Sequence, residues 1–144
     1  MRNDHRNILL AWFARIAVGL VFALNISCAV SFILHPAGYA WGFEVSGVPG
    51  KAVVEGFGIL FLMWNATYPP VLVNPRGQRT LFAVILVQQF IGVVGETWMA
   101  LALPAGHAAM LQTGERFILF DAGGLLVMGI AFLLLFRGKR SGRE

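Results

Sequence analysis

Four long apolar stretches, separated by short polar segments, make up most of the chain. They cover about residues 8–34, 52–73, 80–103 and 117–136. A helix that crosses a bilayer needs about 20 mostly apolar residues, so each stretch is long enough for one crossing. The pattern predicts an all-α membrane protein in which residues 1–144 form a single domain, an antiparallel four-helix transmembrane bundle.

The segments between these stretches carry the residues that end helices. Residues 35–38 read HPAG, residues 74–77 read NPRG and residues 104–106 read PAG. Pro and Gly in such segments mark turns. Pro69 and Pro70 fall inside the second stretch, and they predict a kink or an early end of that helix.

Lys and Arg are distributed unevenly around the stretches, and this distribution predicts the orientation. Cytoplasmic loops of membrane proteins carry an excess of basic residues. If both termini are cytoplasmic, two basic residues lie in the outer connections, Lys51 and Arg116. Eight lie on the inner side: Arg2, Arg6, Arg76, Arg79, Arg137, Lys139, Arg140 and Arg143. We therefore expect a multi-pass protein of the cell membrane with cytoplasmic N and C termini.

Composition supports a membrane protein and excludes several other classes. Hydrophobic residues make up 58% and charged residues 12% of the chain, against roughly 45–50% and about 25% in soluble domains. The net charge is +4, but no basic groove with interleaved aromatic residues points to nucleic acid. The lipid bilayer is therefore the expected partner. The single Cys28 excludes an internal disulfide and a CxxC motif.

Other residues within the stretches suit a bundle in lipid. Arg15 is expected to extend its charged group to the inner surface. Tyr68 is expected at the inner interface as part of an aromatic belt, whereas Trp64 lies deeper and suits packing. Small residues that allow close helix contact occur in four pairs: Gly19 and Ala23, Gly56 and Gly58, Gly92 and Gly95, and Gly123 and Gly124.

Three acidic residues fall within the outer halves of predicted spans. Glu55, Glu96 and Asp121 lie one or two turns from the outer ends of three different stretches, or roughly 5–10 Å below the surface at 1.5 Å per residue. A carboxylate at membrane depth costs several kcal/mol unless it is paired, protonated or hydrated, so it normally faces the bundle interior. We therefore expect a polar pocket that opens outward.

Helical spacing adds further residues to this expected pocket. Gln89 shares a face with Glu96, and Asn25 shares one with His35. The predicted ligand-binding residues are Glu55, Glu96, Asp121, Gln89, Asn25 and His35. A structural role remains open for each acid, for example a pair between Glu55 and Lys51. His35 and His107 lack a second ligand at i+3 or i+4, so no metal site is predicted. No catalytic residue is assigned.

Residues 15–72 resemble the first half of the DoxX-like four-helix membrane proteins. In that family an Arg near the start of the first span is followed by small and apolar residues, here RIAVGLVF in residues 15–22. A Pro-containing outer loop then leads to a Gly-rich second span with a Glu, here VEGFG in residues 54–58. Residues 25–28, NISC, replace the usual mid-span Gly, and the second half gives no match. The resemblance implies a four-helix bundle and a small subunit of membrane redox or quinone-linked complexes.

The sequence leaves several functions open. The first is a small accessory protein or subunit of a larger, quinone- or redox-linked membrane complex, whose partners are other membrane subunits or further copies of the chain. The second is a small-molecule or ion-binding membrane protein that uses the acidic pocket. A transporter protomer is a further alternative, as is a lipid- or quinone-modifying enzyme with Glu96 or Asp121 as general acid or base. No activated nucleophile supports an enzyme, and no cofactor is identified.

Overall fold

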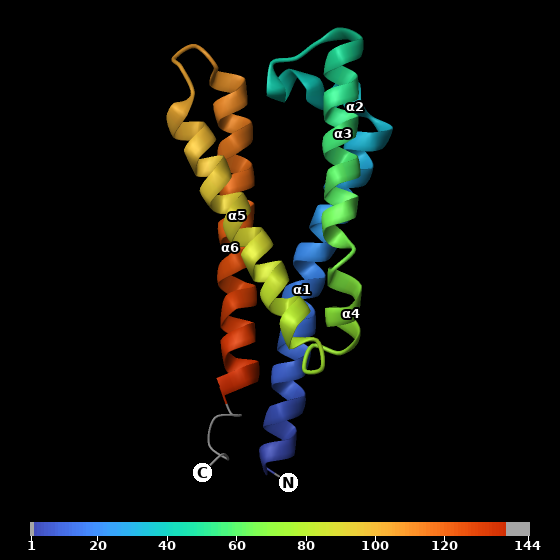
Figure 1. Cartoon of the computed structure of the whole chain (residues 1–144), viewed down its shortest axis with the longest axis vertical. Coiled ribbons are helices and arrows are strands. Elements are labelled where there is room, and N and C mark those ends of the chain that lie inside the picture. The colour runs from blue at the N-terminus through green and yellow to red at the C-terminus, as the bar shows by residue number, and fades with distance from the viewer. Residues whose placement is uncertain (1, 138–144) are drawn as a thin grey trace.

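The computed structural model describes residues 2–137, and the regular structure in this part of the chain is entirely helical. Four helical segments are long and apolar enough to cross a membrane: His5–Leu34, Gly47–Val73, Arg79–Ala102 and Ala108–Phe136. The predicted four spans are thereby confirmed as helices. In Figure 1 the chain rises through the first segment, descends through the second, rises through the third and descends through the fourth.

Three helices begin earlier than the apolar pattern predicted, and one of them, α1 (Arg2–Leu34), starts before residue 8. Helix α3 (Gly47–Asn65) starts before residue 52, and α6 (Ala108–Phe136) starts before residue 117. Pro49 is tolerated because it lies in the first turn of α3, where backbone N–H groups have no partner within the helix. In α6 the polar residues Gln112, Glu115 and Arg116 extend the helix beyond its apolar part. Asp121 therefore lies 13 positions after the start of α6, instead of about one turn.

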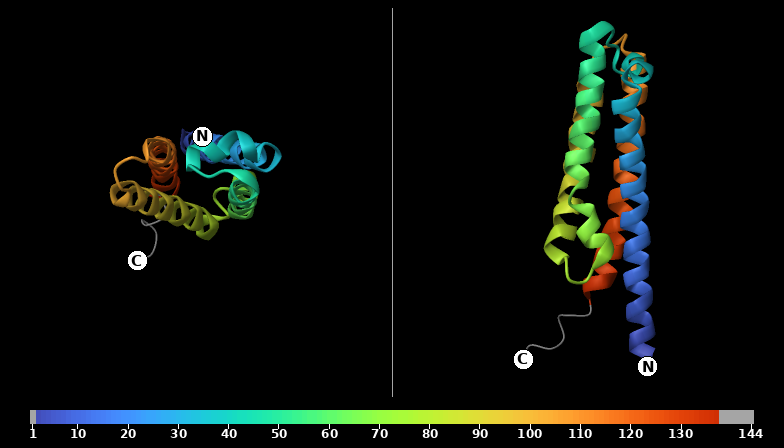
Figure 2. Two further views of the ribbon diagram at one scale, coloured as in Figure 1. Left: turned by 90° about the horizontal axis from the view of Figure 1, so that it is seen from above. Right: turned by 90° about the vertical axis from the view of Figure 1, so that its right-hand side faces the viewer.

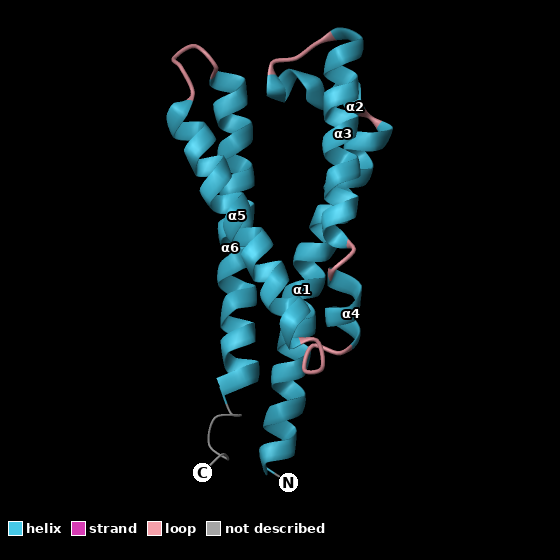
Figure 3. Cartoon of the chain, in the orientation of Figure 1, coloured by secondary structure: helices cyan, strands magenta, loops and turns pink. Residues whose placement is uncertain are grey.

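The second span is broken close to its prolines. Helix α3 ends at Asn65, and α4 (Tyr68–Val73) restarts after Ala66 and Thr67, as Figure 3 shows. A proline cannot donate the helical hydrogen bond, and its ring clashes with the carbonyl four residues earlier. Pro69 and Pro70 therefore occupy the first turn of the new helix, where this constraint costs least. The predicted break is confirmed.

Arg15, which is expected to extend its charged group to the inner surface, bonds to the end of helix α4. On α1 (Arg2–Leu34), its Nε donates to the Leu72 carbonyl and its Nη2 to the Val73 carbonyl, both at 3.1 Å. The last carbonyls of a helix lack partners within the helix. Arg15 satisfies two of them and so holds the end of α4 against α1.

The long helices pack as two pairs that also contact each other. Helix α3 packs along α1, and α5 (Arg79–Ala102) packs along α6, while α1 also contacts α6 and α4 contacts both α1 and α5. Figure 2 shows this arrangement from above and from the side. Gly58 allows the close approach of α1 and α3, since a Cβ there would lie 2.7 Å from the Ala29 carbonyl oxygen. Gly56 has open space around it.

Two clusters of buried apolar side chains lie on either side of a less densely filled region. One cluster includes Tyr68, Phe82 and Met128. The other is built around Phe32 and Val54, near the connection between α1 and α3. Tyr68 was expected at the membrane interface, but it is fully buried because α4 turns it inward against α1 and α5. The candidate site lies between the two clusters.

The connection between α1 and α3 is itself folded. It contains α2 (Pro36–Tyr39) and a 3₁₀ helix, η1 (Ala40–Phe43), which contacts α6. At Glu44 the backbone adopts a left-handed conformation with φ 53°, and the chain then turns into α3. The connection therefore reaches from the α1–α3 pair across to the α5–α6 pair.

The start of α1 and the end of α6 lie at the same end of the molecule, as Figure 1 shows. The connection between α4 and α5, which carries Arg76, also lies at this end. Arg76 Nη2 donates to the Asn7 backbone carbonyl at 2.8 Å and so joins this connection to α1. Lys139, Arg140 and Arg143, which contribute to the predicted orientation, lie outside the described residues, as does the side chain of Arg2.

Candidate functional site

A cavity of about 320 Å³ lies between α1, α3, α5 and α6. Its polar lining includes Asn25, Asn65, Gln89, Glu96 and Asp121, and we call this cavity the acidic chamber. Four of the six predicted ligand-binding residues are thus brought together. They come from three helices: α1 supplies Asn25, α5 supplies Gln89 and Glu96, and α6 supplies Asp121.

Glu55 and His35, the other two predicted residues, are not part of the chamber lining. Both side chains are exposed. Helix α3 turns Val54 and Gly58 toward the protein interior, and Glu55 follows Val54 by one residue, which places it about 100° around the helix. His35 directly follows the last residue of α1. The expected convergence of three carboxylates therefore involves two, Glu96 and Asp121.

A chain of hydrogen bonds fixes the position of Asp121. Gln89 Nε2 donates to Asp121 Oδ1 at 2.9 Å, and Tyr68 Oη donates to Gln89 Oε1 at 3.3 Å. Gln89 is only 1% exposed, so both ends of its amide are committed inside the protein. The Asp121 carboxylate also lies directly against Gly92, where a Cβ would collide with Oδ2. Glycine at position 92 therefore makes room for the carboxylate between α5 and α6.

Glu96 lies one turn farther along α5 than Gly92, toward the connection between α5 and α6. The two carboxylates therefore lie at different levels of the bundle, whereas the sequence predicted one level. Glu96 Oε2 is buried and has no hydrogen-bond partner within the described part of the chain. A buried polar atom without a partner costs about 1–3 kcal/mol, and more when it is charged. Glu96 thus lines the chamber and carries an acceptor that no described residue uses.

The two asparagines of the chamber bond to each other. Asn25 Nδ2 donates to Asn65 Oδ1 at 3.3 Å, and Asn65 Nδ2 donates to the Phe61 carbonyl at 2.7 Å. Asn65 is the last residue of α3 and is 2% exposed. This pair joins α1 to the broken end of α3. The side-chain amides of Asn25 and Asn65 therefore donate largely within the protein.

Aromatic rings form much of the remaining wall. Phe61 and Trp64 come from α3, while Phe117 and Phe120 come from α6. The Phe61 and Phe117 rings meet edge to face, with centroids 6.1 Å apart. The faces of aromatic rings attract cations electrostatically. The chamber thus combines carboxylate acceptors with aromatic surfaces.

A second, mainly apolar cavity of about 460 Å³ adjoins the chamber, and we call it the apolar cleft. It lies between the α3 side and the α5–α6 side, and its lining includes Phe57, Met99, Leu103, Met110 and Gly114. Three residues line both cavities: Phe61, Glu96 and Phe117. The sequence did not predict this cleft, because it depends on how far α3 and α5 separate.

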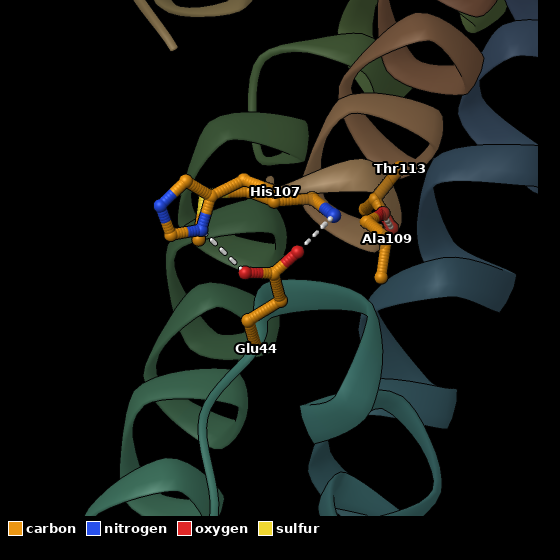
Figure 4. A network of polar contacts seen from close by, with 5 residues as sticks. Glu44, His107, Ala109 and Thr113 are labelled. Carbon is orange, nitrogen blue, oxygen red and sulfur yellow. Dashed lines mark hydrogen bonds and ion pairs between the residues drawn. The ribbon is translucent and has the colours of Figure 1, made fainter. Parts of the chain in front are cut away.

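Glu44 and His107 join the connection between α1 and α3 to the connection between α5 and α6, which are the two connections expected on the outer side, as Figure 4 shows. Glu44 Oε2 lies 2.5 Å from His107 Nδ1, and Glu44 Oε1 accepts a hydrogen bond from the Met110 backbone N–H at 3.2 Å. These two contacts, which we call the outer clasp, tie the η1 segment to the start of α6. The hydrogen bond with His107, followed by that from Met110, lowers the pKa of Glu44 below its ordinary value of 4.5.

The described residues contain no group of three or more His, Cys, Asp or Glu side chains placed to hold a metal ion.

The sequence reasoning missed Tyr68 and Asn65 as parts of the site. Both flank the break before Pro69, and that break was the available signal, because a helix interrupted inside a bundle turns polar groups toward its partners. Arg116, which the sequence analysis placed in an outer connection, lines the chamber with an exposed side chain.

Comparison with known proteins gives no match: no protein-family model, curated protein or solved structure matches the chain. The resemblance of residues 15–72 to DoxX-like proteins therefore stays a prediction.

Proposed function

We propose that the chain is a multi-pass protein of the cell membrane that forms an antiparallel four-helix bundle with both termini cytoplasmic. Four helices of sufficient length and apolar character support the multi-pass arrangement. The excess of Lys and Arg at one end supports the orientation. The resemblance to DoxX-like proteins agrees with this architecture. In this orientation the outer clasp and the apolar cleft lie toward the outer leaflet.

Within this bundle, we propose that the acidic chamber binds a small organic cation such as an ammonium or guanidinium group. The observation that carries this proposal is the buried, unpartnered Oε2 of Glu96 in the wall of a cavity. Gln89 and Asn25 use their amides within the protein, so the two carboxylates provide the free acceptors. They outnumber the one positive charge of the lining, the exposed Arg116. A cation would supply the missing donors, and Phe61 and Trp64 would offer ring faces to it.

The role is binding rather than catalysis. A general acid or base must lie beside a reacting group and be oriented by other residues. Asp121 is held by Gln89, but Glu96 has no such support within the described residues. This arrangement suits charge recognition.

Binding of propylammonium to the protein in lipid nanodiscs tests the proposal. Trp64 lines the chamber, so its fluorescence reports binding once Trp12, Trp41 and Trp98 have been replaced by Phe. We expect saturable binding that weakens at least tenfold in Glu96→Gln, because a hydrogen bond to a charged group contributes about 1.5–3 kcal/mol.

Glu55→Gln is the matched control for this experiment. It removes an acid of the same type from a helix that also borders the chamber, but its side chain is exposed and outside the chamber lining. We expect it to retain wild-type affinity, and we expect propionate to bind no variant. Equal affinities in wild type and Glu96→Gln, or equal losses in both variants, would contradict the proposal.

The exposed side chain of Glu55 favours a second function, that of a subunit in a larger membrane complex. It lies eight positions inside α3, one turn after Lys51, and its surface is not covered by the described residues. A carboxylate facing lipid is costly, so a partner subunit or a second copy of the chain would stabilise it. Purification in mild detergent tests this function: co-purification that Glu55→Gln weakens supports it, and a monomer without a partner overturns it.

A further inference from the structure

The acidic chamber and the apolar cleft meet at three shared residues. Phe61, Glu96 and Phe117 line both, so Glu96 stands at the boundary between a polar and an apolar space. A ligand group that pairs with Glu96 from the chamber side therefore has apolar surface directly behind it. The two cavities together have the polarity of a molecule with a charged head and an apolar chain.

The wall of the cleft offers an apolar chain good contacts and offers a polar ligand few. Besides Glu96, the polar side chain in its lining is Thr113, whose hydroxyl donates to the Ala109 carbonyl at 3.0 Å. Met99 and Met110 are among the lining residues, and methionine side chains adapt to irregular apolar shapes. A short polar ligand would leave this space unused.

The cleft opens at the side of the bundle. Its walls come from the α1–α3 pair on one side and the α5–α6 pair on the other, and these pairs pack internally. Trp98 and Met99, which belong to the lining, are 75% and 66% exposed. At the outer end, the clasp between Glu44 and His107 joins the connections that flank the cleft. Helices α3 and α5 do not pack along each other, so in the proposed orientation a route between them would lead to the bilayer, whereas the sequence predicted an opening toward the outside.

We propose that the ligand is a single-chain amphiphile with a basic head, which enters from the bilayer between α3 and α5. Its head lies in the acidic chamber beside Glu96, and its chain lies in the apolar cleft. Charge complementarity with two carboxylates selects the head, and the apolar lining selects the chain. This inference rests on the proposed binding of a cation in the chamber and adds the class of ligand.

Gly114 provides a direct way to fill the cleft. It lines the cleft, and a Cβ built on it meets no atom within 4 Å, so Gly114→Leu places a side chain in open space. Gly123 is the matched control, because it lies on the same helix with equally open surroundings and lines neither cavity. The affinities of both variants for propylammonium and octylammonium are compared, with Trp64 fluorescence as the reporter. Each affinity is calculated from the free ligand concentration in water.

In wild type, we expect affinity to rise by up to about fourfold for each added methylene, since each buried methylene contributes about 0.8 kcal/mol. Gly114→Leu should weaken octylammonium at least tenfold while propylammonium stays within about twofold, and Gly123→Leu should change neither. The retained propylammonium binding also shows that the variant is folded.

Two outcomes separate this inference from the function on which it rests. If Gly114→Leu and Gly123→Leu bind octylammonium equally well while propylammonium still binds, the chain does not occupy the cleft. The amphiphile is then wrong, and cation binding in the chamber stands. If propylammonium fails to bind wild type, both proposals are overturned.

Discussion

Gln89 is the residue on which the hydrogen bonds of the chamber depend. Its amide accepts from Tyr68 and donates to Asp121, so one side chain joins α4, α5 and α6. An amide can do both because it carries a donor and an acceptor on one rigid group. An apolar residue of similar size would leave two buried polar groups without partners.

We expect Gln89→Leu to lower the free energy of unfolding by about 1–3 kcal/mol, the cost of leaving a buried polar group unsatisfied. Unfolding by SDS in mixed micelles measures the change. Gln88→Leu is the control, because Gln88 is half-buried and its partner, the Thr67 hydroxyl, keeps a bond to the Trp64 carbonyl. Equal losses in the two variants would show that the Gln89 network adds no stability of its own.

Helical spacing was enough to group Gln89 with Glu96, and the depth of Asp121 in its own stretch was enough to expect it in the same pocket. Spacing relates residues on one helix, and the interior face of α5 is marked by Gln89 and Gly92. Glu55 could not be assigned in this way. Its position depends on which face of α3 meets α1, and Gly58 decides that by allowing contact with the Ala29 carbonyl. Small residues occur on several faces, so the pattern left this choice open.

Close contact between α1 and α3 is the feature that orients the second span. It depends on Gly58, where a Cβ would lie 2.7 Å from the Ala29 carbonyl oxygen and equally close to the Ile33 side chain. The carbonyl belongs to the backbone of α1 and can move only if the helix moves. Helix association in lipid relies on such packing, because water does not drive it.

We expect Gly58→Ala to lower the free energy of unfolding by about 1–3 kcal/mol, as overpacking does. Gly56→Ala, two residues earlier, places its methyl group in open space and should be neutral or stabilising by up to about 1 kcal/mol. Parallel SDS unfolding curves of the two variants give the comparison. A Gly58→Ala variant as stable as Gly56→Ala would contradict the close packing of α1 on α3.

Among the helices, the apolar pattern predicted the four candidate spans but not where each helix begins. Hydropathy falls at Arg116 and Glu115, whereas helix α6 continues to Ala108 because helical backbone bonds do not require apolar side chains. The break before Pro69 was predictable, since proline removes a backbone donor wherever it stands. The separation of α3 from α5 was not, because it results from packing among four helices.

The outer clasp links the two helix pairs at the level of the whole molecule, and its effect should depend on pH. The hydrogen bond with His107 lowers the pKa of Glu44 in the folded protein. As the pH falls, the Glu44 carboxylate therefore binds a proton at a higher pH in the unfolded chain than in the folded protein. Its contribution to stability is therefore complete above pH 4.5 and is lost as the pH falls through the lower folded pKa.

We expect stability to fall below pH 4.5 more steeply in wild type than in Glu44→Gln. Thermal unfolding between about pH 3 and pH 6 measures this difference. Glu115→Gln is the control. It alters an exposed acid on α6 that is not part of the clasp, and it should follow the wild-type curve. Identical pH profiles for wild type and Glu44→Gln would show that the clasp contributes nothing.

The proposed orientation makes opposite predictions for the two ends of the bundle. Val48, near the start of α3, is 80% exposed, and Thr80, near the start of α5, is exposed at the other end. In a Cys28→Ala background, a membrane-impermeant maleimide should label Val48→Cys in intact cells and Thr80→Cys only after permeabilisation. The reverse pattern would invert the orientation, and labelling of both in intact cells would contradict a membrane-spanning bundle.

Glu96 and Asp121 line the chamber in which we propose that a small organic cation binds. The most direct test is a crystal structure of the protein in a lipid phase soaked with 3-bromopropylammonium, in which the anomalous signal of bromine locates the ligand. We predict one bromine peak in the wild-type crystals, between Phe61 and Phe117, and no peak in Glu96→Gln. A chamber filled by side chains, or a peak that persists in Glu96→Gln, would contradict this proposal.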